Sequence, residues 1–348
     1  MPATIFLFPN LVLSSEQTKR LGKAVAPASL REFLANCDSF RCTDVFANPA
    51  LSGFTASQWL WMLLSQRDTL APTAPYTWKG LGGPKVDQEF WSLNGYRFED
   101  GRLESSSDTF DIDDECDLRD LFSPLARRFN FDVQVLDGRF FFVRKQAWNT
   151  ICVPWEAQRG KLKTPADGEN ASQWEELHQE IESALASSEL NRRRNQEGKP
   201  RLDGFWVSGG GFDEQLLPYT QIRCLLSDDP YAKGVAEAAG ISKNYIVSPK
   251  KGWPDCPEGD RLCVMTDFED PRVKEDSELW TKTWDQTIEK LRTYMEGCVG
   301  FEKYHPRLVA CSGMRVSIVE RTKEPAKGFS LFRKKYDHAA DWLSAGNL

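Results

Sequence analysis

The sequence predicts an α/β protein whose C-terminal half holds a mixed, partly parallel sheet with flanking helices and whose N-terminal half is an irregular α+β region. Three observations lead to this prediction. From residue 172 onward, short apolar runs typical of strands alternate with amphipathic helical stretches. The first half instead mixes helices with a hairpin signal and a segment rich in Pro and Gly. Finally, 41% of the 348 residues are hydrophobic, which is enough for a sizeable core.

A boundary between the two halves is expected near residue 165. Residues Gly160 to Gly168 combine Lys, Pro and Gly as a linker does, and Ser172 and Glu175 then have the spacing of a capping box that opens a helix. We therefore predict an N-terminal α+β region over residues 1–165 and an α/β domain over 166–348.

In the first half, apolar spacing and turn residues define the elements. The Asp137-Gly138 pair lies between two alternating apolar runs, a strong hairpin signal. The expected helices are Ser14–Leu21, Ala28–Ala35, Thr55–Gln66 and Leu118–Arg128, and the expected strands are Trp91–Phe98 (one strand, or a pair broken at Asn94-Gly95), Phe131–Leu136 and Arg139–Val143.

An acidic segment, Ser105 to Asp117, precedes the last of these helices. It invites a calcium-loop interpretation, but it lacks the central glycine and the closing glutamate that such a loop needs. A solvated acidic loop is the favoured interpretation.

The second half shows a more regular alternation. Asp229-Pro230 is typical of a helix start, and residues Trp280 to Met295 place their apolar side chains on one helical face. The expected order is helix 174–190, strand 202–207, a sharp loop 208–211, strand 222–226, helix 230–240, helix 276–295, hairpin 307–311 with 314–320, and helix 332–343.

Charge and composition exclude several classes of function. The formal net charge is -7, so the overall field repels nucleic acid and anionic membranes. The longest apolar windows are far too short to span a bilayer, and the apolar run before Pro9 has no basic lead. Nine scattered cysteines without a Cys-x-x-Cys pair are typical of reduced thiols. We expect a soluble cytoplasmic protein that binds neither nucleic acid nor membrane.

The candidate ligand-binding residues lie in three places. Gly209, Gly210 and Gly211 follow a strand, where glycines let backbone N–H groups approach an anion. Arg194 belongs to an arginine-rich helix end, with Arg192, Arg193, Lys199 and Arg201, that suits bidentate binding of phosphate or carboxylate. Asp228 ends a strand, a common ligand position in α/β proteins. A structural turn is the alternative for the glycines and a solvated helix end for Arg194, and at the strand end Pro230 makes the neighbouring Asp229 a helix cap first.

Motifs for other chemistries are missing. The three histidines, His178, His305 and His338, lack zinc-site spacing, and no Gly-x-Ser-x-Gly elbow occurs. No catalytic residue is assigned, and no metal ligand or cofactor is expected.

The run W-E-E-L-H-Q-E-I from Trp174 and the run L-N-R-R-R-N-Q-E-G-K-P-R-L-D-G-F-W-V-S-G-G-G ending at Gly211 resemble a bacterial family related to phosphoglycerate mutase, the regulator-of-pathogenicity-factors E type. The same stretch is similar to a segment of archaeal cofactor-independent phosphoglycerate mutases, with matches at Asn191, Arg194, Gly198, Pro200 and Gly209. This resemblance adds Asn191 to the candidate ligand-binding residues.

The resemblance implies a mutase-related scaffold for the C-terminal half. Those mutases use two divalent metals held by Asp and His, with a serine nucleophile. Here Val207 and Ser208 occupy the turn where the family has a substrate-binding arginine, and no N-terminal Asp-Gly metal motif occurs.

The combination predicts a non-catalytic regulatory or ligand-binding protein on a phosphoglycerate mutase-related scaffold, with a small anionic ligand or a protein as its partner. One alternative is a metal-dependent enzyme, a phosphoglycerate mutase-like isomerase or a phosphatase acting on phosphorylated small molecules. Another is a protein-interaction scaffold, suggested by twelve tryptophans.

Overall fold

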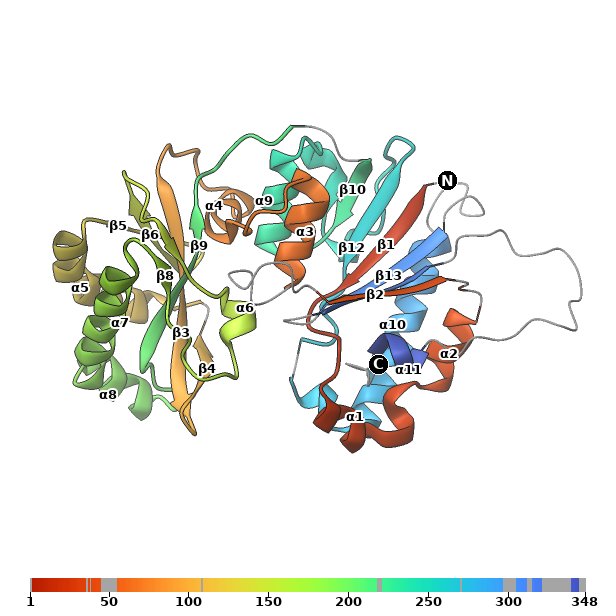
Figure 1. Ribbon diagram of the computed structural model, residues 1–348, viewed down its shortest axis with the longest axis horizontal. Helices are drawn as coiled ribbons and strands as arrows, with labels where there is room; N and C mark the ends of the chain where they lie inside the picture. The colour runs from red at the N-terminus through yellow and green to blue at the C-terminus, as the bar shows by residue number, and fades with distance from the viewer. Residues whose placement is uncertain are drawn as a thin grey trace, which may run out of the picture.

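The computed structural model describes residues 2–35, 37, 39–44, 55–107, 109–217, 221–269, 271–296, 305–311, 315–320 and 339–343. It confirms the mixed α/β class, and Figure 1 shows two sheets side by side along the long axis. The predicted tail helix falls partly outside these residues, as does His338.

The larger sheet has seven strands in the order β11-β10-β12-β1-β13-β14-β2. The strands from β11 to β13 are parallel, whereas β14 and β2 join in antiparallel pairing. Because β1 lies between two parallel neighbours, all six of its residues are buried. The bounds are β1 Ala3–Phe8, β2 Ser39–Asp44, β10 Ile222–Leu226, β11 Ile246–Val247, β12 Asp260–Val264, β13 His305–Cys311 and β14 Arg315–Glu320.

Helices cover both faces of this sheet, as the alternating side chains of β1 require. Phe6 and Phe8 pack on one side and Ile5 and Leu7 on the other. The first face carries α1 Ser15–Leu21, η1 Gly22–Val25, α2 Ala28–Leu34, α10 Ser277–Glu296 and α11 Ala339–Leu343, and the second carries α3 Ala56–Ser65 and α9 Pro230–Ala238.

The smaller sheet has five antiparallel strands, in the order β4-β3-β6-β5 with β9 also paired to β3. An aromatic core lies under α5, α7 and α8, and α4 packs on the opposite face. The bounds are β3 Glu89–Glu99, β4 Arg102–Ser107, β5 Asp132–Leu136, β6 Arg139–Arg144, β9 Gly204–Gly211, α4 Thr73–Gly80, α5 Ile112–Phe129, α7 Ala171–Ala186 and α8 Glu189–Gln196.

Short elements complete the described chain. A two-stranded ribbon lies beside the smaller sheet, and α6 lies between the two sheets in Figure 1. These elements are β7 Thr150–Ile151, α6 Trp155–Gln158, β8 Asp167–Gly168, η3 Lys243–Tyr245, η4 Pro249–Lys251 and η5 Pro271–Lys274.

Two glycines let α4 and α9 pack against each other at backbone distance. A Cβ atom on Gly80 would lie 1.8 Å from the Pro230 carbonyl oxygen, and one on Gly234 would lie 1.8 Å from the Tyr76 carbonyl oxygen. No side chain fits there, so the contact requires glycine at both positions. It joins α4 of the smaller sheet to α9 of the larger sheet.

Of the two alternatives for Trp91–Phe98, the single strand is confirmed, because β3 pairs on both edges at Asn94-Gly95 and Gly95 lies at a bulge. Two other local predictions were wrong. Most of the described part of the acidic segment belongs to the end of β4 and the start of α5 rather than to a loop, and Asp111 caps α5 by accepting from the Asp114 N–H. The capping box at Ser172 does not form, because α7 begins at Ala171 and its N-cap Asn170 makes no capping hydrogen bond.

Both sheets cross the boundary predicted at residue 165. β1 and β2 pair with strands of the second half, and β9 pairs with β3 of the first half. The smaller sheet with α4 is continuous in sequence over residues 73–211, and it is inserted between strands of the larger sheet.

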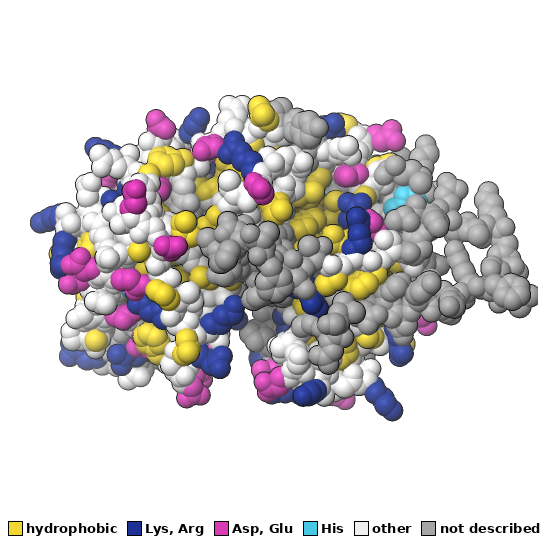
Figure 2. All heavy atoms as spheres, in the orientation of Figure 1, with side chains coloured by type: hydrophobic (Ala, Val, Ile, Leu, Met, Phe, Trp, Pro, Cys, Tyr) yellow, Lys and Arg dark blue, Asp and Glu magenta, His cyan; other side chains and the backbone are white. Residues whose placement is uncertain are grey.

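The surface in Figure 2 mixes Lys and Arg with Asp and Glu, so this face has no large area of one charge. Among the described residues, no helix combines the length and apolar character needed to cross a membrane.

Candidate functional site

The carboxyl ends of the parallel strands β1, β10 and β12 meet at one edge of the larger sheet. Ligands of open α/β sheets bind at such an edge. Here the edge faces α6 and the end of the smaller sheet, and a cavity of about 610 Å3 lies between them. Its polar and charged lining includes Asn10, Ser57, Glu156, Arg159, Asp229 and Lys274.

A second cavity of about 200 Å3 adjoins the first, because Ser57, Trp155, Glu156 and Asp229 line both. It extends toward β3 and β9 through Ser92 and Ser208. We call the two cavities together the cleft.

Ser57 and Glu156 are joined at the centre of the cleft. Ser57 lies in the first turn of α3, which Thr55 caps by accepting from the Gln58 N–H. Its Oγ donates to Glu156 Oε1 at 2.5 Å, and the Tyr231 hydroxyl donates to the Ser57 carbonyl at 3.0 Å. These contacts hold the Glu156 carboxyl on the cleft wall.

Neighbouring protein atoms displace part of the water around the Glu156 carboxyl, and this loss of hydration raises its pKa. The charge of Asp229 raises the pKa further, whereas the hydrogen bond from Ser57 lowers it. The side chain nevertheless keeps solvent-accessible surface, because the cleft is hollow beside it. Glu156 is thus a cavity-facing carboxyl that binds a proton more readily than a free glutamate does.

Asp229 is the second carboxyl at the centre. It caps α9, with Oδ2 accepting from the Ala232 N–H at 2.8 Å. Burial raises its pKa, while this N–H and the charges of Arg139 and Lys233 lower it. Neither Asp229 nor Glu156 has an ion-pair partner within 4.0 Å among the described residues.

Lys274 lies on another wall, at the end of η5, and its Nζ donates to the Asn10 carbonyl. Burial and the charge of Arg159 lower its pKa to about 8, while Glu269 raises it. Lys274 therefore loses its proton at a lower pH than an exposed lysine does.

The charge balance of the larger cavity is acidic. Its carboxyl groups are Glu104, Glu156, Asp229, Glu269 and Glu275, and its cationic groups are Arg159 and Lys274. A small anion therefore meets net repulsion there, whereas an amine or a set of hydroxyls meets acceptors.

The structure places Asn191 and Arg194 away from the cleft, on α8. The Asn191 amide donates to the Leu185 and Leu202 carbonyls, and its Oδ1 accepts from the Leu202 N–H at 2.9 Å. Arg194 is 3% exposed, pairs with the buried Asp114 and donates from Nε to the Pro200 carbonyl at 2.9 Å. Both side chains fasten α8 to its neighbours and leave little capacity for a ligand.

The glycines were predicted as a loop, but they lie within the strand β9. The register of β9 against β3 shifts between Phe90 and Ser92, which forms a bulge, and Gly209 there has φ +69°. A Cβ on Gly209 would lie 2.0 Å from Thr73 Oγ1, so the glycine allows the close approach of α4.

Asp228 lies at the expected strand end, where it accepts from Ser248 Oγ at 3.1 Å. None of the six predicted residues lines the cleft, but the neighbours Ser208 and Asp229 do.

His178 is buried between Trp174 and Trp206, and its Nε2 accepts from the Val207 N–H at 3.4 Å.

Ser57, Glu156, Arg159 and Lys274 were missed by the sequence analysis. They come from three distant segments that meet only through the tertiary fold, and none belongs to a recognisable motif. Asp229 was noted as a helix cap, and the strand end before it was the usable signal.

The donor set does not fit the two-metal centre that the sequence resemblance implies. β1 is followed by Pro9 and Asn10 rather than by a carboxylate. Within the described ranges, His, Cys, Asp and Glu side chains nowhere form a group of three that would hold a metal ion.

No protein-family model matches the chain, and a search of curated proteins gives no significant match. Among solved structures, the PH0037 protein from Pyrococcus horikoshii matches with a TM-score of 0.50 and 15% identity over 92% of this chain and 87% of that one. The cofactor-independent phosphoglycerate mutase from Thermoplasma acidophilum DSM 1728 matches with a TM-score of 0.42 and 14% identity over 98% of each chain. At this identity, the likeness to the PH0037 protein concerns the fold alone.

Proposed function

We propose that this chain is a non-catalytic ligand-binding protein on a phosphoglycerate mutase-related scaffold, and that the cleft binds a small molecule carrying an amine or several hydroxyls. The observation that carries the proposal is the pair Glu156 and Asp229, two cavity-facing carboxyls without an ion-pair partner among the described residues. The mutase-related part of the proposal rests on the runs around Asn191 and Gly209.

The pair is preorganised for binding. Ser57 holds Glu156, and the N-terminus of α9 holds Asp229, so little side-chain entropy is lost when a ligand binds. The raised pKa of each carboxyl reflects unmet demand for positive charge or donated hydrogen bonds. An ammonium group between them satisfies both carboxyls, which is why we prefer it to the small anion expected from the arginine-rich helix end.

A thermal-shift experiment tests the proposal with three probes: agmatine as an organic dication, sorbitol as a neutral polyol, and 3-phosphoglycerate as an anion. A ligand at a hundred times its dissociation constant stabilises the folded state by about 2.7 kcal/mol, a rise of several degrees in Tm. We expect agmatine or sorbitol to raise Tm and 3-phosphoglycerate to leave it unchanged. A shift with 3-phosphoglycerate alone contradicts the proposed ligand class.

The matched variants are Glu156→Gln, which removes one cleft charge and keeps an acceptor for Ser57, and Glu258→Gln, which removes an exposed charge outside the cleft. The agmatine shift should shrink in the first variant and persist in the second. Equal shifts in both variants mean that the probe binds elsewhere.

A second candidate function is a metal-dependent phosphomutase or phosphatase. The observation in its favour is the Ser57 hydroxyl beside the Glu156 and Asp229 carboxyls. Turnover of phosphoglycerates that depends on manganese and disappears in Ser57→Ala establishes this function and removes the non-catalytic one.

A further inference from the structure

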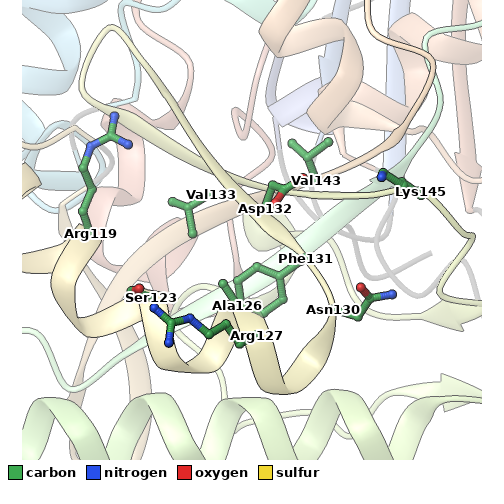
Figure 3. A pocket seen from close by; sticks show the side chains of 10 residues that line it. All are labelled: Arg119, Ser123, Ala126, Arg127, Asn130, Phe131, Asp132, Val133, Val143 and Lys145. Carbon is green, nitrogen blue, oxygen red and sulfur yellow. The ribbon is translucent and has the colours of Figure 1, made fainter.

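The outer end of the smaller sheet carries a second site, separate from the cleft. A cavity of about 500 Å3 lies between the last turns of α5 and the β5–β6 hairpin (Figure 3). None of its lining residues lines the cleft. Its floor is apolar, formed by Ala126, Phe131, Val133 and Val143, and Phe131 is fixed by stacking on Phe142 at 3.8 Å between ring centroids.

Cationic groups surround this floor on two sides. Arg119 and Arg127 extend from α5, and Lys145 follows β6. Arg119 pairs with Glu115, but Arg127 and Lys145 are exposed and have no ion pair among the described residues. The carboxylate in the lining is Asp132, so the site is cationic in a chain whose net charge is -7.

The same site borders a free sheet edge. β5 is the last strand of its sheet and pairs only with β6 among the described strands. The hairpin loop is the two-residue turn Asp137-Gly138, with φ +53° and +70°, so Leu136 and Arg139 form its hydrogen-bonded closing pair. By alternation, the N–H and C=O groups of Val133 and Val135 point outward, away from β6.

We propose that β5 binds an extended acidic peptide as an added strand. The outward groups of Val133 and Val135 pair with the peptide backbone, and side chains of the peptide alternate between the two faces of the sheet. Acidic side chains then meet Arg119 and Arg127 on one side and Lys145 on the other, while apolar ones pack on Val133 and Phe131. The charge of the rim selects an acidic partner over a basic one.

Fluorescence anisotropy tests this with a fluorescein-labelled peptide of alternating valine and glutamate, and with the same peptide carrying lysine for glutamate. We expect the acidic peptide to bind with an affinity that falls as salt rises, and the basic peptide not to bind. Absence of acidic-peptide binding at about 1 mM overturns the proposal.

Two pairs of variants separate the strand from the charges. Val135→Pro deletes one outward N–H, which an edge strand tolerates, and Val135→Thr keeps it. Arg127→Glu with Lys145→Glu reverses two charges of the rim, and Lys85→Glu with Lys251→Glu makes the same change in net charge at exposed residues outside the site. We expect about tenfold weaker binding from Val135→Pro and from the rim reversal, and no change from the two controls.

A peptide with N-methyl groups along one edge repeats the test on the unaltered protein, so a folding defect in Val135→Pro does not decide the outcome. Its binding should be lost along with its backbone donors. Binding that survives both the proline and the N-methyl groups shows a pocket for free carboxylates and overturns strand addition.

Discussion

Glu156 shows how a single side chain depends on its surroundings in this fold. Its carboxyl keeps contact with solvent, yet nearby protein atoms and Asp229 make ionisation costly. Such a group favours binding of a cation and disfavours the unliganded, ionised state, so the same feature that supports the proposed function reduces stability.

The pH dependence of stability follows from this. The folded-state pKa of Glu156 is raised above its ordinary 4.5. The contribution of Glu156 to folding stability is therefore fully present below pH 4.5, where the carboxyl is protonated, and it is lost as the pH rises through the folded-state pKa. We expect Glu156→Gln to raise Tm at pH 7 and to change it little at pH 4, measured by calorimetry without ligand. A constant difference across this range contradicts the raised pKa.

Arg194 and Arg192 are neighbours with opposite roles. Arg194 pairs with the buried Asp114, whereas Arg192 is exposed and pairs with Glu189. Arg194→Ala removes one of the two arginines that pair with the buried Asp114 and leaves it with Arg193, and we expect a loss of about 2 kcal/mol in unfolding free energy. Arg192→Ala should change it by no more than about 0.5 kcal/mol, as chemical denaturation would show. Similar losses in the two variants would argue that Arg194 is not a structural residue.

At the scale of elements, α4 was not predicted from the sequence. Residues 70–83 are rich in Pro, Gly and Thr, which predicts a loop, yet Thr73–Gly80 is helical because Gly80 and Gly234 let it dock on α9. The packing energy of this contact outweighs poor helix propensity. In contrast, the β5–β6 hairpin and α10 were confirmed, because turn chemistry and a long apolar stripe are local signals.

The residues of the cleft could not be identified from the sequence, because their grouping also depends on tertiary contacts. Asn191, Arg194 and the glycines stood out because of their residue types, and the structure uses these types for packing. Ser57, Glu156 and Lys274 are unremarkable in sequence, and they become a site only when α3, α6 and η5 meet.

The docking of α4 on α9 gives a prediction for Gly234. A methyl group there would clash with the Tyr76 carbonyl, so we expect Gly234→Ala to lower the unfolding free energy by at least about 2 kcal/mol. Lys233→Ala, one residue earlier on the same helix, should cost less than about 0.5 kcal/mol in the same denaturation experiment. A neutral Gly234→Ala would show that the helices separate easily.

In the whole molecule, strands that are neighbours in a sheet can lie far apart in the sequence. β1 lies between β12 and β13, so the larger sheet requires both ends of the sequence, whereas the smaller sheet is continuous over residues 73–211. The division at residue 165 remains a prediction about folding units, and strand pairing provides a direct way to test it.

Two fragments make that test. We expect residues 166–348 alone to show no cooperative thermal transition by circular dichroism, because they lack β1 and β3, and residues 73–217 to show one. Cooperative unfolding of the 166–348 fragment would support the division at residue 165 instead.

The cleft exists only when both sheets are assembled, so its occupancy is best measured on the full chain. Amide hydrogen exchange with and without agmatine locates the ligand directly. We expect slower exchange in residues 55–60, 155–159 and 228–232 of the wild type, and a smaller effect in Glu156→Gln. Unchanged exchange in these three segments, or protection confined to residues 119–145, would contradict the assignment of the cleft as the ligand site.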